Sequence, residues 1–311
     1  WPWRIGENTA AAESLQPVRG LVTPFLRDLG EAVADGGARA YRVGSGADDA
    51  RKKVLVLGDS HAEHLTFGLD YLGKKYGFVV DFYVSTGCPP IFGTYKVFGV
   101  GGIKNPPPRQ ELCKRQTGKW ERFVTDHHYD FVVLASRWAW LYEPMQYEKY
   151  RIRNDFLVEP HDPVYTVDGS RETFSKYLPL TIESISRSGA VPIVFSQVPN
   201  VGKNPDGCDD VPRYVINDGA MNRRCSGVSA AAALQRLKFT DTTIRETTRR
   251  LGAFSVIPSE YFCDPEQIEC RGFDGTTRLY KDADHVNEAG SLFLAKRWEA
   301  DQRFPFAAET R

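Results

Sequence analysis

The sequence predicts a doubly wound α/β fold, in which helices cover both faces of a mostly parallel sheet. From residue 53 onward, strand-like apolar runs alternate with longer helix-like stretches, a pattern that is typical of parallel sheets with crossover helices. The strand expected at 53–57 runs directly into Gly58-Asp59-Ser60-His61. In open α/β sheets ligands bind where strands end and helices begin, so this turn is the first candidate for a site.

The expected elements alternate along the chain. Residues 53–57 (KVLVL) form a short apolar run with β-branched side chains, which indicates a buried parallel strand, and a helix-compatible polar stretch follows it. The same reasoning assigns the other elements. We expect strands at 78–84, 130–135, 190–196 and 253–257, and helices at 61–76, 170–188, 229–251 and 287–299.

Three long segments interrupt this alternation, and we expect them to be loops. Residues 86–115 are rich in Gly and Pro, residues 138–169 are rich in Tyr, Trp and charge, and residues 198–228 contain two cysteines. Loops of this length in a compact domain are usually functional.

The first 50 residues differ from the rest. A stretch with Ala and Glu at helical spacing precedes Gly36-Gly37 and Gly44-Ser45-Gly46, which indicates an extension joined by a Gly-rich linker to a main domain at 51–311. A frayed terminus is the alternative, but Trp1 and Trp3 argue against disorder. The chain starts with Trp and shows no secretory signal, so we expect it to begin inside a longer protein.

Composition excludes several classes of function. The chain has 311 residues, of which 40 are basic and 40 acidic, a formal net charge of +0 and a pI of about 7.2. This balance gives no general attraction to nucleic acid or to acidic membranes, so we expect no nucleic-acid partner. No window of the sequence approaches the run of about 18 apolar residues that a membrane-spanning helix needs.

The six cysteines predict disulfides and therefore an oxidising compartment. Each has Pro, Gly or charged neighbours, whereas reduced core thiols, the alternative, would lie in apolar strands. The sequence has no short Cys-x-x-Cys or His pair of the kind that binds zinc, and we expect no metal. Proximity along the chain favours the pairs Cys88–Cys113, Cys208–Cys225 and Cys263–Cys270.

Ser60 and the late segment 282–285 (DADH) supply the side chains of a serine triad. In this interpretation Ser60 is the nucleophile at a helix N-terminus, His285 takes its proton, and Asp282 orients His285. Asp284 competes with Asp282, but a residue immediately before His285 is expected to project away from the imidazole. Taken alone, the Gly-Asp-Ser word would be a capped turn, and the late segment an acidic loop before a helix.

Two more histidines follow the nucleophile. His61 and His64 are three residues apart and would share one face of a helix. With Glu63 they suggest a metal site, but Glu63 would point elsewhere and no third ligand is evident, so we expect a packing or solvated role. The other histidines, which we expect on the surface, are His127, His128 and His161.

Four segments resemble the SGNH/GDSL hydrolase family and, more narrowly, the SGNH domain fused to acyltransferase family 3 (AT3) membrane proteins, which O-acetylate bacterial surface polysaccharides. They are 54–62 (VLVLGDSHA), 85–90 (STGCPP), 132–138 (VVLASRW) and 279–287 (LYKDADHVN). The resemblance implies a three-layer α/β/α sandwich with a mostly parallel central sheet. It also implies that residues 1–50 connect this domain to a membrane domain.

The resemblance further implies an oxyanion hole, which the tetrahedral intermediate of acyl transfer requires. In the family the donors are the backbone N–H of the nucleophile, here Ser60, a Gly that matches Gly87, and an Asn. A Gly lets its N–H approach the substrate, although a turn before Cys88 also explains Gly87. No Asn follows the strand expected at 130–135. The chain has Arg137 there, either as a donor or as an arginine paired with a carboxylate.

Aromatic residues crowd the segment after that strand, and their faces suit sugar rings. We expect Trp138 and Trp140 to contact substrate, although core filling explains half or more of the group. Its other members are Tyr142, Tyr147 and Tyr150.

The resemblance implies a periplasmic O-acetyltransferase domain of an inner-membrane protein. Ser60 would carry the acetyl group and pass it to a bacterial cell-surface polysaccharide, such as lipopolysaccharide O-antigen. An AT3 membrane domain of the same chain would supply the acetyl group, and the chemistry requires no cofactor. No Gly-rich phosphate loop follows a strand, so we expect no coenzyme A site. The alternatives are a carbohydrate O-acetyl esterase and a non-catalytic module that positions glycan.

Overall fold

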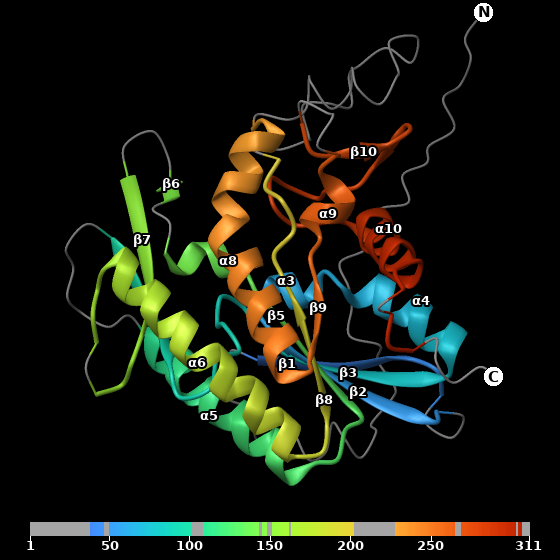
Figure 1. Ribbon diagram of the computed structural model, residues 1–311, viewed down its shortest axis with the longest axis horizontal. Helices are drawn as coiled ribbons and strands as arrows, with labels where there is room; N and C mark the ends of the chain where they lie inside the picture. Colours follow the sequence, from blue (N-terminus) through green and yellow to red (C-terminus); the bar gives the residue numbers. More distant parts are fainter. Residues whose placement is uncertain are drawn as a thin grey trace, which may run out of the picture.

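The described part of the chain is organised around a six-stranded sheet with the order β1-β3-β2-β5-β8-β9 (Figure 1). Our computed structural model describes residues 38–46, 50–100, 108–142, 145–147, 151–161, 163–201, 228–264, 269–302 and 304–306. The strands of this sheet are β1 Ala38–Gly44, β2 Lys52–Gly58, β3 Phe78–Ser85, β5 Phe131–Ala135, β8 Val191–Phe195 and β9 Phe254–Val256.

Neighbouring strands of this sheet are parallel except at one edge, where β1 pairs antiparallel with β3. β2 lies between β3 and β5, and its last residue, Gly58, is opposite Val84 of β3 and Ala135 of β5. The carboxyl ends of the three strands therefore meet at one edge of the sheet. The segments that hold Ser60 and Gly87 leave the sheet at this edge.

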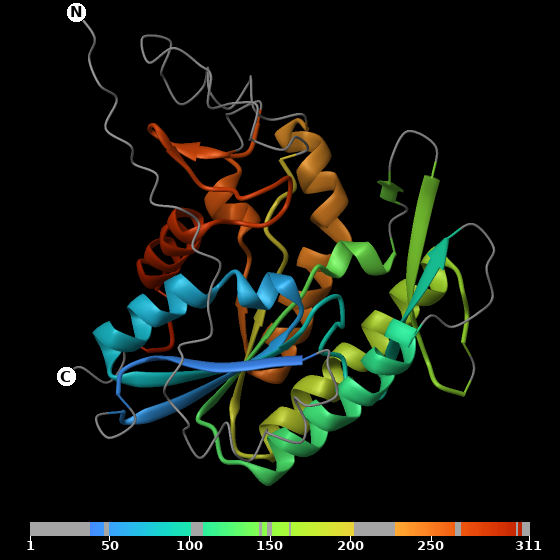
Figure 2. The same ribbon diagram turned by 180° about the vertical axis from the view of Figure 1, so that it is seen from behind.

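Helices cover both faces of the sheet, as the two opposite views show (Figures 1 and 2). Alternate β2 side chains point to opposite faces: Val54 and Val56 pack in the core with α4 and α10, and Leu55 and Leu57 pack in the core with α5 and α6. This arrangement confirms the predicted three-layer α/β/α sandwich. The helices are α3 Ser60–Glu63, α4 Thr66–Tyr76, α5 Pro108–Asp126, α6 Val167–Arg187, α8 Ala230–Leu251, α9 Ser259–Phe262 and α10 Glu288–Glu299, with a 3-10 helix, η1, at Trp138–Leu141.

The predicted strands and the helices at 170–188, 229–251 and 287–299 are confirmed to within a few residues. The helix predicted at 61–76 is wrong in one respect, because two helices, α3 and α4, occupy the segment. The break has a local cause. The backbone N–H of Leu65 bonds to the carbonyl of Ala62, three residues back, at 3.1 Å, and this tighter turn ends α3.

Two segments predicted as loops contain regular structure, so those predictions are wrong. They hold a second sheet, in the order β4-β7-β6, and the start of α5. Proline suits the first turn of a helix, where its missing N–H has no helical partner, so the Pro-rich run that suggested a loop ends in a helix start at Pro108. The third predicted loop, 198–228, lies mostly outside the described residues. The remaining strands are β4 Tyr95–Val100, β6 Met145–Tyr147, β7 Arg151–Val158, β10 Phe273–Asp274 and β11 Thr277–Arg278.

β1 lies within the stretch that we assigned to the N-terminal extension. It is fixed to the sheet by its pairing with β3 and by Arg42, which donates to the buried carboxylate of Asp81 at 2.8 Å. Residues 1–37 lie outside the described residues, so the division of the chain at residue 50 stays a prediction. Among the helices that the structure describes, none is both long and apolar enough to cross a membrane.

Candidate active site

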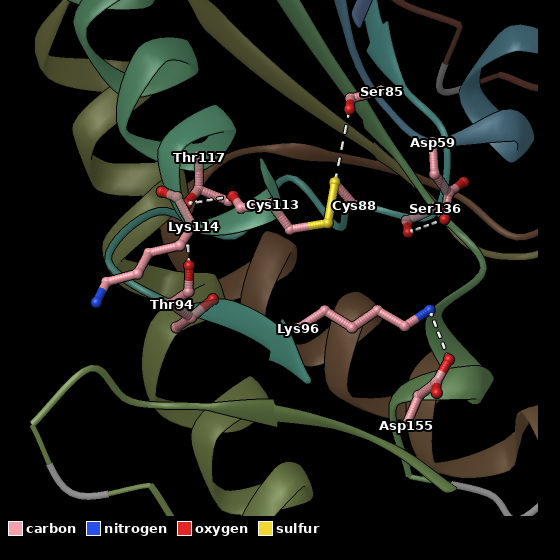
Figure 3. Close-up of a disulfide and its surroundings, with 10 residues drawn as sticks. All are labelled: Asp59, Ser85, Cys88, Thr94, Lys96, Cys113, Lys114, Thr117, Ser136 and Asp155. Atoms are coloured by element: carbon pink, nitrogen blue, oxygen red, sulfur yellow. Dashed lines mark hydrogen bonds and ion pairs between the residues drawn. A yellow bond between two sulfur atoms is a disulfide. The ribbon is translucent and has the colours of Figure 1, made fainter. Parts of the chain in front are cut away.

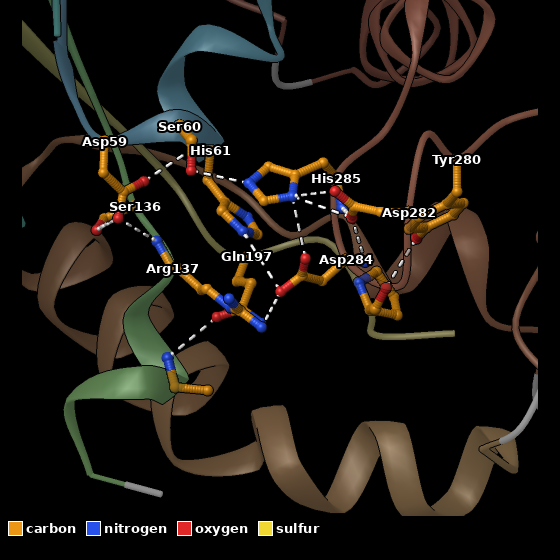
Figure 4. A network of polar contacts seen from close by, with 12 residues as sticks. Asp59, Ser60, His61, Ser136, Arg137, Gln197, Tyr280, Asp282, Asp284 and His285 are labelled. Atoms are coloured by element: carbon orange, nitrogen blue, oxygen red, sulfur yellow. Dashed lines mark hydrogen bonds and ion pairs between the residues drawn. The ribbon is translucent and has the colours of Figure 1, made fainter. Parts of the chain in front are cut away.

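Ser60 lies at the turn between β2 and α3 (Figure 4). Gly58 makes this turn possible, because its φ is +151° and a Cβ there would lie 1.8 Å from the carbonyl oxygen of Ala135. Asp59 then caps α3, since its carboxylate accepts the backbone N–H of His61 at 2.9 Å. The two residues together place Ser60 at the first position of a helix, at the edge of the sheet.

His285 reaches Ser60 from the segment between β11 and α10. Its Nε2 lies 2.8 Å from Ser60 Oγ, although 225 residues separate the two in sequence. Asp282 holds this segment in a turn, because its Oδ1 accepts the backbone N–H of Asp284 at 3.0 Å and that of His285 at 2.8 Å. The structure thus brings the predicted nucleophile, base and orienting carboxylate into one hydrogen-bonded series.

Two carboxylates, rather than one, lie against Nδ1 of His285 (Figure 4). Asp282 Oδ2 is 2.9 Å from this nitrogen, and Asp284 Oδ1 is 3.0 Å from it. The expectation that Asp284 projects away from the imidazole is therefore wrong, because the turn that Asp282 caps brings the Asp284 side chain back to the ring. Asp284 is also the more buried of the two, with 6% of its side chain exposed against 40% for Asp282.

These carboxylates set the protonation of His285. Burial favours the neutral imidazole, but hydrogen bonds to Asp282 and Asp284 outweigh burial and raise the pKa of His285 to about 9. Burial also opposes ionisation of Asp282, but its bonds to the His285 ring and to backbone N–H groups prevail and hold the pKa of Asp282 below its ordinary value. At neutral pH the resting His285 is therefore mostly protonated, and its basic form grows as the pH approaches 9.

Arg137 holds Asp284 from the other side. Its guanidinium forms an ion pair with Asp284 Oδ2 and stacks on Trp140, 3.5 Å from the ring centroid. Its backbone N–H donates to Asp59 Oδ2 at 3.1 Å. These contacts confirm that Arg137 pairs with a carboxylate. The role of Arg137 as an oxyanion donor stays a prediction.

Asp59 joins two strand ends next to Ser60. Its carboxylate is buried, caps α3 through Oδ1, and accepts the Ser136 hydroxyl at 2.7 Å and the Arg137 backbone N–H at 3.1 Å through Oδ2. The segment after β5 is thereby fixed to the turn that carries Ser60. Sequence reasoning missed this role. The available signal was the aspartate itself, immediately before a helix that starts at Ser60.

His61 is buried beside His285 rather than solvated. Its ring centroid lies 4.7 Å from that of His285 and 4.9 Å from that of His64. Burial, together with the positive charge of neighbouring histidines, holds the pKa of His61 well below its ordinary value. His61, Asp284 and His285 are metal-binding residue types whose candidate ligand atoms lie within 4.8 Å of one another. Arg137 already places a positive charge on the same carboxylate, which opposes a second cation, and we assign no metal site.

A disulfide fixes the chain next to Gly87 (Figure 3). The bond joins Cys88 to Cys113, as predicted. Gly87 has φ +78°, a conformation that favours glycine, in a turn closed by the bond from the Cys88 N–H to the Ser85 carbonyl at 3.0 Å. Because this turn follows β3, Gly87 lies at the same edge of the sheet as Ser60. Its role as an oxyanion donor stays a prediction.

The predicted disulfide between Cys263 and Cys270 is also present, after α9. Cys208 and Cys225, the third predicted pair, lie outside the described residues. Two of the three pairings are therefore confirmed, and the third stays a prediction.

The two tryptophans predicted to contact substrate have packing contacts. Trp138 is 0% exposed, and its indole N–H donates to the Phe195 carbonyl at 2.8 Å. Protein covers this ring, so the prediction of a sugar contact is wrong for Trp138. Trp140 is half-buried, and two cations lie over its ring, Arg137 at 3.5 Å and Lys96 at 4.7 Å from the centroid. For Trp140 the substrate contact stays a prediction.

A buried ion pair lies within the second sheet, close to this site, and sequence reasoning missed it (Figure 3). Lys96 of β4 and Asp155 of β7 lie 3.1 Å apart, with 1% and 0% of their side chains exposed. Lys96 also contacts the Trp140 ring that Arg137 stacks on. Residues of the second sheet therefore support the arginine that holds Asp284.

Comparisons with known proteins identify the family of the chain and proteins with a similar fold. The sequence matches the family described as SGNH domain (fused to AT3 domains) over residues 27–300. No curated protein matches it significantly. The periplasmic domain of a lipopolysaccharide acetyltransferase from Salmonella ser. Paratyphi A has a similar structure, with a TM-score of 0.53 and 15% identity over 90% of this chain and 97% of that one.

Two esterases are more distant structural neighbours. An acetyl xylan esterase has a TM-score of 0.42 and 16% identity over 80% of this chain and 98% of its own. A carbohydrate acetylesterase from Sinorhizobium meliloti has a TM-score of 0.42 and 7% identity over 79% of this chain and 96% of its own. Because the family match spans most of the sequence, the chain belongs to the family of SGNH domains fused to AT3 domains.

Proposed function

We propose that the chain is a periplasmic O-acetyltransferase domain that passes acetyl groups to a bacterial cell-surface polysaccharide, such as lipopolysaccharide O-antigen, through an acetyl-serine. The observation that carries this proposal is the contact of 2.8 Å between Ser60 Oγ and His285 Nε2 at the carboxyl end of a central strand. The family match adds that such domains occur fused to AT3 domains.

In the first half-reaction Ser60 is the nucleophile. His285 Nε2 takes the hydroxyl proton as Ser60 Oγ attacks the carbonyl carbon of an acetyl donor. The oxyanion that forms is held by the backbone N–H groups of Ser60 and Gly87. The intermediate collapses, the bond to the leaving group breaks, and His285 returns the proton to that group.

In the second half-reaction a polysaccharide hydroxyl replaces the donor. It gives its proton to His285 and attacks the acetyl carbon, and the bond to Ser60 Oγ breaks as Ser60 regains a proton. Asp282 holds the imidazole in the tautomer with the proton on Nδ1 and stabilises the imidazolium of each intermediate. No step needs a cofactor.

The acetyl donor is an AT3 membrane domain in the same protein. The family description, in which the domain occurs fused to AT3 domains, supports this partner. The disulfides at Cys88–Cys113 and Cys263–Cys270 favour an oxidising compartment, which supports a periplasmic location.

The competing function is ester hydrolysis with the same triad, where water replaces the sugar hydroxyl. The test is to incubate the domain with an activated acetyl ester, with and without an oligosaccharide acceptor, and to quantify acetyl-sugar and free acetate by mass spectrometry. We expect acetyl-sugar to form at the expense of acetate, and only with Ser60 present. Release of acetate alone at every acceptor concentration would assign the domain to the esterases.

A further inference from the structure

The proposed mechanism uses the Asp282 carboxylate and assigns no role to the more buried carboxylate of Asp284. Asp284 Oδ1 lies 3.0 Å from His285 Nδ1, the same distance as Asp282 Oδ1, and 4% of the residue is exposed. A buried carboxylate is expensive unless it is paired, so its position against the imidazole needs an explanation. The alternative of a solvated acidic loop does not fit this burial.

The contacts of Asp284 form a closed circuit that includes Ser60. From Ser60 the circuit runs to His285 at 2.8 Å, to Asp284 at 3.0 Å, and on to the guanidinium of Arg137. The backbone N–H of Arg137 then donates to Asp59 at 3.1 Å, and Asp59 precedes Ser60 in the chain. Each member restricts the next, so the distance between Ser60 Oγ and His285 Nε2 depends on the whole circuit.

We propose that Asp284, clamped by Arg137, is a second positioning residue for His285, and that the base is held by two carboxylates that can partly replace each other. This inference rests on the proposed function, because it assumes that His285 is the general base. The two carboxylates differ in surroundings. Asp282 is the more exposed one and caps the turn, whereas Asp284 is shielded from solvent and salt, so its charge acts on the ring with less screening.

The consequence is an unusual response to loss of Asp282. In a triad with one carboxylate, an Asp-to-Asn change leaves the base in the wrong tautomer and costs about 10⁴ in rate. Here Asp284 still accepts the proton on Nδ1 when residue 282 is Asn, so the productive tautomer persists. We expect Asp282→Asn to lose less than about 10²-fold in kcat/KM, and the double variant with Asp284→Asn to lose about 10⁴-fold.

The pH profile separates positioning from a merely structural role. The neutral imidazole is the base, so kcat/KM of the wild type rises with pH toward the His285 pKa of about 9. Removing either carboxylate removes a charge that stabilises the imidazolium, so the midpoint moves to lower pH. The charged and titratable groups that face or neighbour His285 are Asp282, Asp284, Arg137, Glu63, His61, His64 and Lys281.

The experiment measures kcat/KM against pH for ester hydrolysis in the wild type, Asp282→Asn, Asp284→Asn and the double variant. Asp168→Asn on α6, where 84% of the side chain is exposed, is the matched control and should leave the profile unchanged. Titration of the His285 imidazole by ¹⁵N NMR reads the same effect without substrate. If Asp284→Asn alone fails to fold, the double variant Arg137→Gln with Asp284→Asn is measured in its place, because it removes both charges of the buried pair and leaves neither one unpaired.

Two outcomes would overturn the inference. One is a full loss of about 10⁴-fold in Asp282→Asn alone. The other is a His285 titration in the Asp284→Asn variant that matches the wild type. Neither outcome contradicts the proposed function. The proposed function fails if a folded Ser60→Ala variant keeps its ester turnover. The two failures are therefore distinguishable.

Discussion

Replacing Gly58 with Ala is expected to damage stability and catalysis together. The new Cβ would lie 1.8 Å from the carbonyl oxygen of Ala135 and 2.8 Å from the Cβ of Ala62. Real Cβ contacts below 3.0 Å essentially do not occur, so β2 and β5 would have to separate locally by about 1 Å or more. The blocking atom belongs to the backbone of the neighbouring strand, and no side-chain rotation relieves the contact.

The size of the effect follows from two costs. Forcing extra atoms into a packed interior costs roughly 1–3 kcal/mol, and a strained backbone conformation costs roughly 1–3 kcal/mol more. We therefore expect the free energy of unfolding to fall by about 2–6 kcal/mol. Ser60 follows two residues later, and a displacement of about 1 Å in a reacting group can cost about 10²-fold in rate.

Urea unfolding and hydrolysis of p-nitrophenyl acetate measure the two effects. Gly77→Ala is the matched control, because Gly77 also has positive φ, +72°, but nothing lies within 4 Å of a Cβ there. It should lose about 1–2 kcal/mol for the left-handed conformation and keep its activity. The reasoning is refuted if Gly58→Ala resembles Gly77→Ala in both measurements.

Three further predictions follow from the same structure. Ser60→Ala should remain folded by circular dichroism and lose about 10⁶-fold in ester turnover, and substantial activity in that variant would exclude Ser60 as nucleophile. Changing Cys88 and Cys113 to Ser should lower the free energy of unfolding by about 2–4 kcal/mol, and an unchanged urea midpoint would contradict this. Lys96→Met removes the cation that pairs with the buried Asp155 carboxylate and should cost about 3–5 kcal/mol, more than Lys96→Met with Asp155→Leu, in which both charges of the pair are removed.

The sequence predicts the central sheet because its strands are buried on both faces. Such strands appear as continuous apolar runs, for example 53–57 and 130–135, which differ clearly from the polar helices between them. β4 and β7 carry charged residues at Lys96 and Asp155, and the ion pair between them helps to make those residues compatible with burial. The sequence pattern does not show which charged residues pair with each other. The segments that form the second sheet were therefore expected to be loops.

The arrangement of Ser60, His285 and Asp282 was predictable for a different reason. Ser60, Asp282 and His285 lie in short sequence motifs that can be recognised without knowledge of the fold. These motifs are a strand-to-helix turn and an Asp three residues before a His. Asp284 was not, because its role depends on Arg137, which approaches from another strand end. The direction of a side chain in an irregular turn follows from hydrogen bonds such as those that Asp282 accepts, and residue spacing does not specify them.

The most direct test of the central claim is to trap the acetyl-enzyme. The domain is mixed with an activated acetyl ester, quenched rapidly with acid and digested, and the peptide that carries Ser60 is analysed by mass spectrometry. We expect one added acetyl group on Ser60, which disappears when an oligosaccharide acceptor is added before the quench and reappears as acetyl-sugar. Turnover of the ester with no acetyl group on Ser60 at any quench time, and with acetyl groups on another residue instead, would contradict this expectation.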